Sequence, residues 1–100
     1  MVQSLDIAKI VFDCIDDLNK QLPVGGRLTK VADSILIGDG GVLDSLGLIT
    51  LCVNIEQALS DQLGMECAVL DELMTERAEH PMRTVGTMMQ WIEQQANTAP

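Results

Sequence analysis

Apolar residues recur at spacings of three and four along three separate segments of the 100-residue chain. This spacing is the period of one α-helix face, and long apolar runs of the strand type are missing. The chain has one Phe, one Trp and no Tyr, so its core must consist of Leu, Ile, Val and Met. The pattern predicts an all-α fold, and the length predicts a single domain over residues 1–100 with one modest core.

The first helix is predicted from the N-terminal segment, where Ser4 is a candidate cap. Pro23 and the pair Gly25-Gly26 are expected to stop it. The predicted inward face consists of Leu5, Ala8, Val11, Phe12, Ile15, Leu18 and Leu22.

Residues 21–43 form a long connection that is too irregular for one element. We expect an ordered loop with a short helical turn, because a connection of this length in a small domain has to be tied to the core. A short strand at residues 35–37 remains an alternative. The residues expected to tie the loop down are Leu28, Val31, Ile35, Leu36 and Ile37.

The second helix is predicted from Asp44 to Leu63, with Gly64 as its C-cap. At about 100° per residue, one apolar stripe contains Leu48, Cys52, Ile55, Leu59 and Leu63 and is the better core candidate. A second stripe contains Leu46, Ile49 and Val53, which either meet a partner or pack beneath the long loop. The predicted polar sector of this helix consists of Gly47, Thr50, Asn54, Gln57 and Asp61.

Two further helices are predicted towards the C-terminus. A short one contains Val69 or Leu70, followed by Leu73 and Met74, and the polar residues 75–80 after it are expected to face solvent. Thr84 is predicted to cap the last helix, whose inward face would hold Val85, Met88, Met89 and Ile92. Residues 1–3 and 97–100 are expected to fray.

The chain carries 15 Asp and Glu against 6 Lys and Arg, for a formal net charge of −9. This charge argues against nucleic acid and anionic membrane surfaces as partners. It favours basic protein surfaces, or it serves solubility alone. No window approaches a membrane-spanning length, so we expect a soluble, cytoplasmic protein without membrane insertion. The three cysteines lack metal-ligand spacing, and Cys14 and Cys52 are expected to be buried, reduced thiols.

Ser45 follows a glycine-rich turn and is predicted to stand at the exposed N-terminus of the second helix. A serine nucleophile needs a base, and the only histidine, His80, lies in a distant polar segment. The carboxylate pairs Asp16-Asp17 and Asp71-Glu72 are expected on solvated faces, and the sequence offers no catalytic or metal-ligating set. A helix N-terminus favours a phosphate ester on Ser45, although Asp44 or Ser45 could serve only as a cap.

At this point the chain resembles the acyl carrier proteins and their peptidyl and D-alanyl relatives. The resemblance covers most of residues 28–95 and centres on Asp44-Ser45-Leu46, with further matches at Ile49, Leu51, Glu56, Thr84-Val85-Gly86 and Trp91-Ile92. It implies a carrier-type four-helix bundle with three main helices, one short helix and a long loop between the first and second.

The resemblance also implies a function. Ser45 would carry 4′-phosphopantetheine, transferred from coenzyme A by a phosphopantetheinyl transferase, and the terminal thiol would hold an acyl group as a thioester. The protein would be a monomer that catalyses nothing itself. Its contact surface for the basic docking sites of loading ligases and acyl-processing enzymes would be formed by Asp44, Leu46, Ile49, Val53 and Glu56.

Two positions differ from the commonest carriers of fatty-acid synthesis, because Gly47 and Thr50 stand where those carriers have acidic side chains. The form Gly-x-Leu-Asp-Ser-Leu-Gly is similar to D-alanyl and some freestanding peptidyl carriers. We therefore expect a specialised lipid, polyketide or related pathway, with an aminoacyl carrier as the first alternative. A non-carrier helical adaptor that uses only its acidic face is the second.

Overall fold

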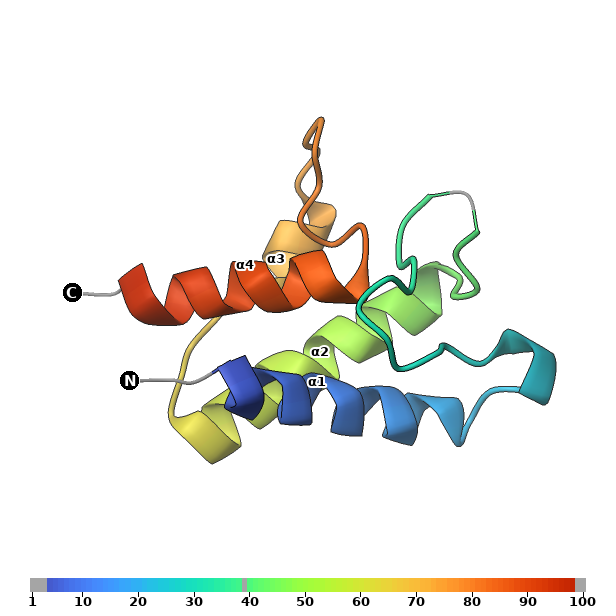
Figure 1. Ribbon diagram of the computed structural model, residues 1–100, viewed down its shortest axis with the longest axis horizontal. Helices are drawn as coiled ribbons and strands as arrows, with labels where there is room; N and C mark the ends of the chain where they lie inside the picture. The colour runs from blue at the N-terminus through green and yellow to red at the C-terminus, as the bar shows by residue number, and fades with distance from the viewer. Residues whose placement is uncertain (1–3, 39, 99–100) are drawn as a thin grey trace.

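The computed structural model describes residues 4–38 and 40–98, which form four α-helices in chain order (Figure 1). The helices are α1 (Ser4–Asn19), α2 (Ser45–Leu63), α3 (Val69–Met74) and α4 (Val85–Thr98), and one 3₁₀ turn, η1, spans Val24–Gly26. The all-α prediction is confirmed, with three longer helices, one short helix and a long connection between α1 and α2. Of the residues expected to fray, 97 and 98 belong to α4, and 1–3, 99 and 100 lie outside the described residues.

Helices α1 and α4 run in opposite directions, so the start of α1 and the end of α4 lie at the same end of the molecule (Figure 1). Helix α1 contacts both α2 and α4, and the short α3 packs on α2. One cluster of buried side chains joins all four helices, with Ile15, Leu51, Val69 and Val85 among its members. Within the described residues, no helix is both long enough and apolar enough to cross a membrane.

The buried face of α1 differs from the predicted one. Leu5 was predicted to face the core but is 82% exposed, because at about 100° per residue it lies on the far side of the helix from Leu18. The prediction also omitted Ile7 and Ile10, which are buried. The face that packs consists of Ile7, Ile10, Val11, Cys14, Ile15 and Leu18.

Helix α1 ends at Asn19, before the predicted stop at Pro23. The side-chain amide of Asn19 pairs with the backbone of Leu28. Its Nδ2 donates to the Leu28 carbonyl at 2.8 Å, and its Oδ1 accepts from the Leu28 N–H at 2.9 Å. The Leu28 side chain is buried, so this pair fixes the first half of the connection to the core.

The second half of the connection is held to the start of α4 by main-chain hydrogen bonds. The Gly86 N–H donates to Ala32 at 2.8 Å, the Val85 N–H donates to Ser34 at 2.9 Å, and the Leu36 N–H donates to Arg83 at 2.8 Å. The strand alternative is wrong for the described residues, where Ile35 and Thr84 form only an isolated bridge. Leu36 is buried as expected.

Two other details of the connection follow from its close packing on α4. A Cβ at Gly86 would lie 3.0 Å from both the Cβ and the carbonyl oxygen of Ala32, so the contact depends on glycine. Val31 was expected to tie the loop to the core but is exposed. The predicted short helical turn is present as η1.

Helix α2 agrees closely with its prediction. It ends at Leu63, and Gly64 adopts the left-handed conformation with φ of 62° and donates its N–H to the carbonyls of Leu59 and Ser60. The predicted core stripe is buried at Cys52, Ile55 and Leu59 and half-buried at Leu48 and Leu63. Leu51, which the stripe did not include, is fully buried as well.

Helices α3 and α4 begin with different kinds of cap. The predicted Thr84 cap is confirmed, because the Thr87 N–H donates to Thr84 Oγ1 at 3.1 Å and the Thr84 N–H donates to Thr87 Oγ1 at 3.0 Å. In α3, the side chain of the preceding residue, Ala68, makes no capping bond. The carboxylate of Glu56 on α2 accepts from the Leu70 N–H instead, at 2.6 Å.

The prediction for α3 was wrong in one side chain. Glu72 was placed on a solvated face but is buried, and Met74, which belongs to the pattern that predicted the helix, is 59% exposed. The Arg77 guanidinium donates to both oxygens of this buried carboxylate, so the charge is paired. Residues 75–79 are exposed, as expected, but His80, which was also expected to face solvent, is half-buried.

Candidate functional site

Ser45 is the first residue of α2 and is exposed. The residue before it, Asp44, is the N-cap, with extended backbone angles φ of −82° and ψ of −179°. Its Oδ1 accepts a hydrogen bond from the Gly47 N–H at 2.7 Å. The capping role therefore belongs to Asp44, and the Ser45 hydroxyl makes no hydrogen bond with any residue that the structure describes.

Gly47 was predicted to lie in the polar sector of α2, but it is buried. A Cβ at this position would lie 3.3 Å from Asp44 Oδ1 and 3.5 Å from the Leu43 side chain. The small residue therefore lets Leu43 and the Asp44 cap pack closely on the first turn. This is a local structural reason for glycine directly after the Asp-Ser-Leu triplet.

The first turn of α2 leaves further backbone donors. Gly47 donates to the Asp44 side chain and Leu48 donates to the Asp44 carbonyl, whereas the N–H groups of Ser45 and Leu46 have no acceptor among the described residues. Free N–H groups and the positive end of the helix dipole favour a negative group on the Ser45 hydroxyl. The site fits a phosphate ester in both exposure and electrostatics.

Within residues 4–38 and 40–98, no His, Asp or Glu side chain makes a hydrogen bond with the Ser45 hydroxyl. His80 lies in the connection between α3 and α4, where its Nδ1 accepts from the Met82 N–H at 3.0 Å. No set of three or more His, Cys, Asp or Glu side chains among the described residues is arranged to hold a metal.

The predicted partner-binding residues all lie on α2 or at its cap. Leu46 and Val53 are 72% and 40% exposed, Ile49 is half-buried and Asp44 is exposed. The second apolar stripe is therefore partly open to solvent, which was one of its two predicted states. Glu56 is half-buried, and one of its oxygens is occupied by Leu70.

Two exposed apolar residues near this surface were not predicted. Met74 ends α3, and Val42, which is 47% exposed, lies three residues before Ser45. Glu72 points into the protein, where it pairs with Arg77. Met74, two residues further along the helix, therefore points towards solvent. No local pattern in the sequence signals that ion pair.

All three cysteines are free thiols. Burial raises the pKa of Cys52 to about 12, with a further contribution from the Glu56 carboxylate. Burial also raises the pKa of Cys14 to about 11, and the nearby Asp17 and Asp13 add to this effect. Since a thiolate is the reactive form of cysteine, these two buried thiols are poor nucleophiles at neutral pH.

Comparison of the chain with protein-family models, with curated proteins and with solved structures found no match. The functional argument therefore rests on the residues themselves and on their arrangement around Ser45.

Proposed function

We propose that the protein is an acyl carrier that bears 4′-phosphopantetheine on Ser45, attached from coenzyme A by a phosphopantetheinyl transferase. The observation that carries this proposal is the division of roles at the start of α2. Asp44 caps the helix, which leaves the exposed Ser45 hydroxyl without a structural task. A hydroxyl in that position is accessible to a modifying enzyme.

The chain offers a suitable environment for the phosphate of the cofactor. Ser45 Oγ would form the ester, and the free N–H groups of Ser45 and Leu46 would interact favourably with the phosphate charge. When bound, the cofactor supplies a flexible arm whose terminal thiol carries an acyl group as a thioester. The protein would contribute no catalytic residue, and the chemistry would belong to its partner enzymes.

The surface next to Ser45 supports recognition by such partners. Leu46, Ile49 and Val53 offer apolar area beside the acidic Asp44, on a chain whose net charge is −9. A basic docking surface with an apolar centre would complement this combination. Glu56 would contribute less than a fully exposed acid, because its Oε1 is engaged by the Leu70 N–H.

The carrier-type bundle, the cytoplasmic location and the monomeric state belong to the same proposal. The acyl cargo of a specialised lipid or polyketide pathway is the first expectation, and an aminoacyl cargo is the alternative suggested by the motif around Gly47. Loading the modified protein with a panel of acyl and amino acids by candidate ligases would separate the two.

Intact-mass measurement after incubation with coenzyme A and a broad-specificity transferase tests the attachment. The wild type is expected to gain the mass of one phosphopantetheine, and Ser45→Ala is expected to gain none. Ser60→Ala is the matched control, because Ser60 is an exposed serine on the same helix. Absence of a mass gain in the wild type, or a gain that survives Ser45→Ala, would leave the non-carrier adaptor as the better description.

A further inference from the structure

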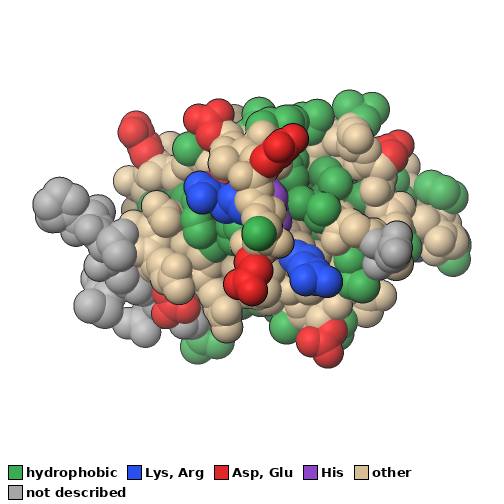
Figure 2. Space-filling model, turned by 90° about the horizontal axis from the view of Figure 1, so that it is seen from above, with side chains coloured by type: hydrophobic (Ala, Val, Ile, Leu, Met, Phe, Trp, Pro, Cys, Tyr) green, Lys and Arg blue, Asp and Glu red, His purple; other side chains and the backbone are tan. Residues whose placement is uncertain are grey.

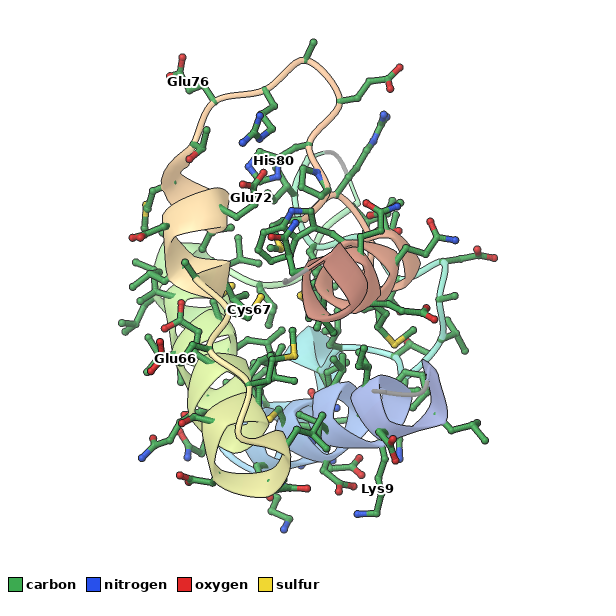
Figure 3. The ribbon with its side chains drawn as sticks, turned by 90° about the vertical axis from the view of Figure 1, so that its left-hand side faces the viewer. Lys9, Glu66, Cys67, Glu72, Glu76 and His80 are labelled. Atoms are coloured by element: carbon green, nitrogen blue, oxygen red, sulfur yellow. The ribbon has the colours of Figure 1, made fainter. Side chains whose placement is uncertain are left out.

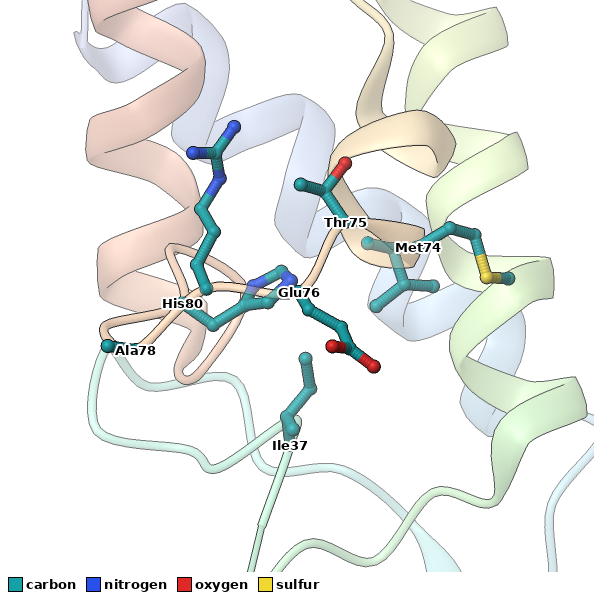
Figure 4. A pocket seen from close by; sticks show the side chains of 8 residues that line it. Ile37, Met74, Thr75, Glu76, Ala78 and His80 are labelled. Atoms are coloured by element: carbon teal, nitrogen blue, oxygen red, sulfur yellow. The ribbon is translucent and has the colours of Figure 1, made fainter.

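A hollow of about 610 Å³ lies beneath the connection between α3 and α4 (Figure 4). Its apolar wall is formed by Ile37, Leu73 and Met74, and its polar wall includes His80. The side chain of Ile37 faces the hollow from the α1–α2 connection, and Met74 lies on the opposite side (Figure 4). Ser45 is not among the lining residues, so this hollow is separate from the proposed attachment site.

His80 contributes a hydrogen-bond donor that has no partner. Its Nδ1 accepts from the Met82 N–H at 3.0 Å, so in the neutral ring the proton must be on Nε2. Nε2 is buried and has no hydrogen-bond partner among the described residues. Figure 2 shows only a small part of the histidine surface, between basic and apolar side chains. A buried donor of this kind is rare enough to require an explanation.

The charges around the hollow do not favour an anion. Arg77 is the one cation among the described lining residues, and its guanidinium is already paired with both oxygens of Glu72. The hydrogen bond and charge of Glu72 raise the pKa of Arg77. Figure 3 shows Glu72 and His80 pointing into the same space between α3 and α4. Glu76 also lines the hollow, and its exposed carboxylate is seen above Ile37 in Figure 4.

We infer that this hollow binds a small uncharged molecule with an apolar body and a carbonyl oxygen, such as an amide, an ester or a thioester. The apolar body would contact Ile37, Leu73 and Met74, and the carbonyl oxygen would accept the Nε2–H of His80. Because Nε2 is buried, binding requires residues 74–79, which are all exposed, to shift aside on this side of the hollow.

The first experiment follows the His80 ring in the wild-type protein by NMR. His80 is the only histidine, so its ring signals need no further assignment. At about pH 8, where an ordinary imidazole is neutral, the nitrogen shifts should identify the Nε2–H tautomer. Hexanamide should then shift the Nε2–H resonance in a saturable manner. Hexanoate has the same chain but a negative charge, and it should bind about fivefold more weakly or less.

The second experiment tests whether His80 contributes to binding in addition to the apolar residues of the hollow. His80→Phe keeps an aromatic ring but removes both ring nitrogens, so the Nε2–H donor is lost together with the Nδ1 acceptor of the Met82 N–H. The folded variant should bind hexanamide about tenfold more weakly. Glu79→Gln is the matched control, because Glu79 belongs to the same connection but does not line this hollow, and it should leave the affinity unchanged. No saturable shift with hexanamide, equal binding of hexanoate, or wild-type affinity in a folded His80→Phe variant would each overturn the inference. If His80→Phe does not fold, the wild-type titration alone decides.

Discussion

Helices α2 and α3 begin in different ways. The first turn of α2 is capped by Asp44, which lies in the same turn and accepts from Gly47. The first turn of α3 is capped by Glu56, which comes from another helix and lies fourteen residues before its partner Leu70. The start of α2, and with it Ser45, is therefore specified locally, whereas α3 depends on its contact with α2.

Removal of the remote cap should produce the larger loss of stability. Glu56→Ala leaves the part-buried Leu70 N–H without an acceptor, and we expect the free energy of unfolding to fall by about 1–3 kcal/mol in urea denaturation. Glu56→Gln keeps an acceptor oxygen and should lose less stability than Glu56→Ala. Gln57→Ala changes an exposed neighbour and serves as control. A loss in Glu56→Ala no larger than in this control would show that α3 does not need the cap.

Removal of the Asp44 cap should lower the free energy of unfolding by less than removal of the Glu56 cap. Asp44→Ala removes the acceptor for the Gly47 N–H, and the free energy of unfolding should fall by about 1 kcal/mol. Asp44→Asn should retain most of the stability, because asparagine is a comparable N-cap. Ser45→Ala should change stability by less than about 0.5 kcal/mol, since the serine is exposed and caps nothing. Equal losses in Asp44→Ala and Ser45→Ala would mean that both residues cap the helix.

The free energy of unfolding should also depend on pH through Cys67, which lies two residues before α3. Burial, together with the carboxylates of Glu56 and Glu72, raises the pKa of this thiol from 9.0 to about 11. The folded protein therefore holds this proton to higher pH than the unfolded chain. The associated stability is complete below pH 9.0 and is lost as pH rises towards about 11.

Denaturation curves between these pH values test the effect. Cys67→Ala should reduce the dependence of the unfolding free energy on pH, by up to about 1.4 kcal/mol per pH unit. Glu56→Gln should lower the folded pKa of Cys67 and weaken the same dependence in part. An unchanged slope in Cys67→Ala would assign the alkaline loss to the other thiols, Cys14 and Cys52.

The smallest effect on stability is expected on the exposed side of α2. Leu46→Ala should change the free energy of unfolding by less than about 0.5 kcal/mol, and Ile49→Ala by less than about 2 kcal/mol, while both weaken processing by partner enzymes. Leu51→Ala is the buried comparison and should lose about 2–5 kcal/mol. A loss of about 2 kcal/mol or more in Ile49→Ala would assign that residue to the core.

The same contrast explains what could be predicted from the sequence. Helices α2 and α4 were predicted closely because their caps, Asp44 and Thr84, and the glycine at 64 act on neighbouring residues. The burial of the Glu72 side chain was not predicted, because its partner, Arg77, lies beyond the end of α3. Leu5 was assigned to the core because periodicity gives the spacing of a face but only weakly its direction.

At the candidate site, too, features set by neighbouring residues were predicted, and features set by residues distant in sequence were not. The exposure of Ser45 was predicted from the turn and the helix that follow one another in sequence, and it is confirmed. The internal role of Glu56 and the burial of Gly47 were not predicted, because both depend on side chains that meet only after folding. The cofactor, the partners and the cargo remain predictions from the resemblance.

The main-chain bonds between residues 32–36 and residues 83–86 have a consequence for protein engineering. Hydrogen bonds between peptide groups do not depend on which side chains the residues carry. An exposed side chain such as that of Asp33 could therefore be exchanged to change the charge of this surface. Gly86 is the exception, since its lack of a side chain is what lets the two segments meet. Such a redesigned surface would leave the main-chain contact between the two segments in place.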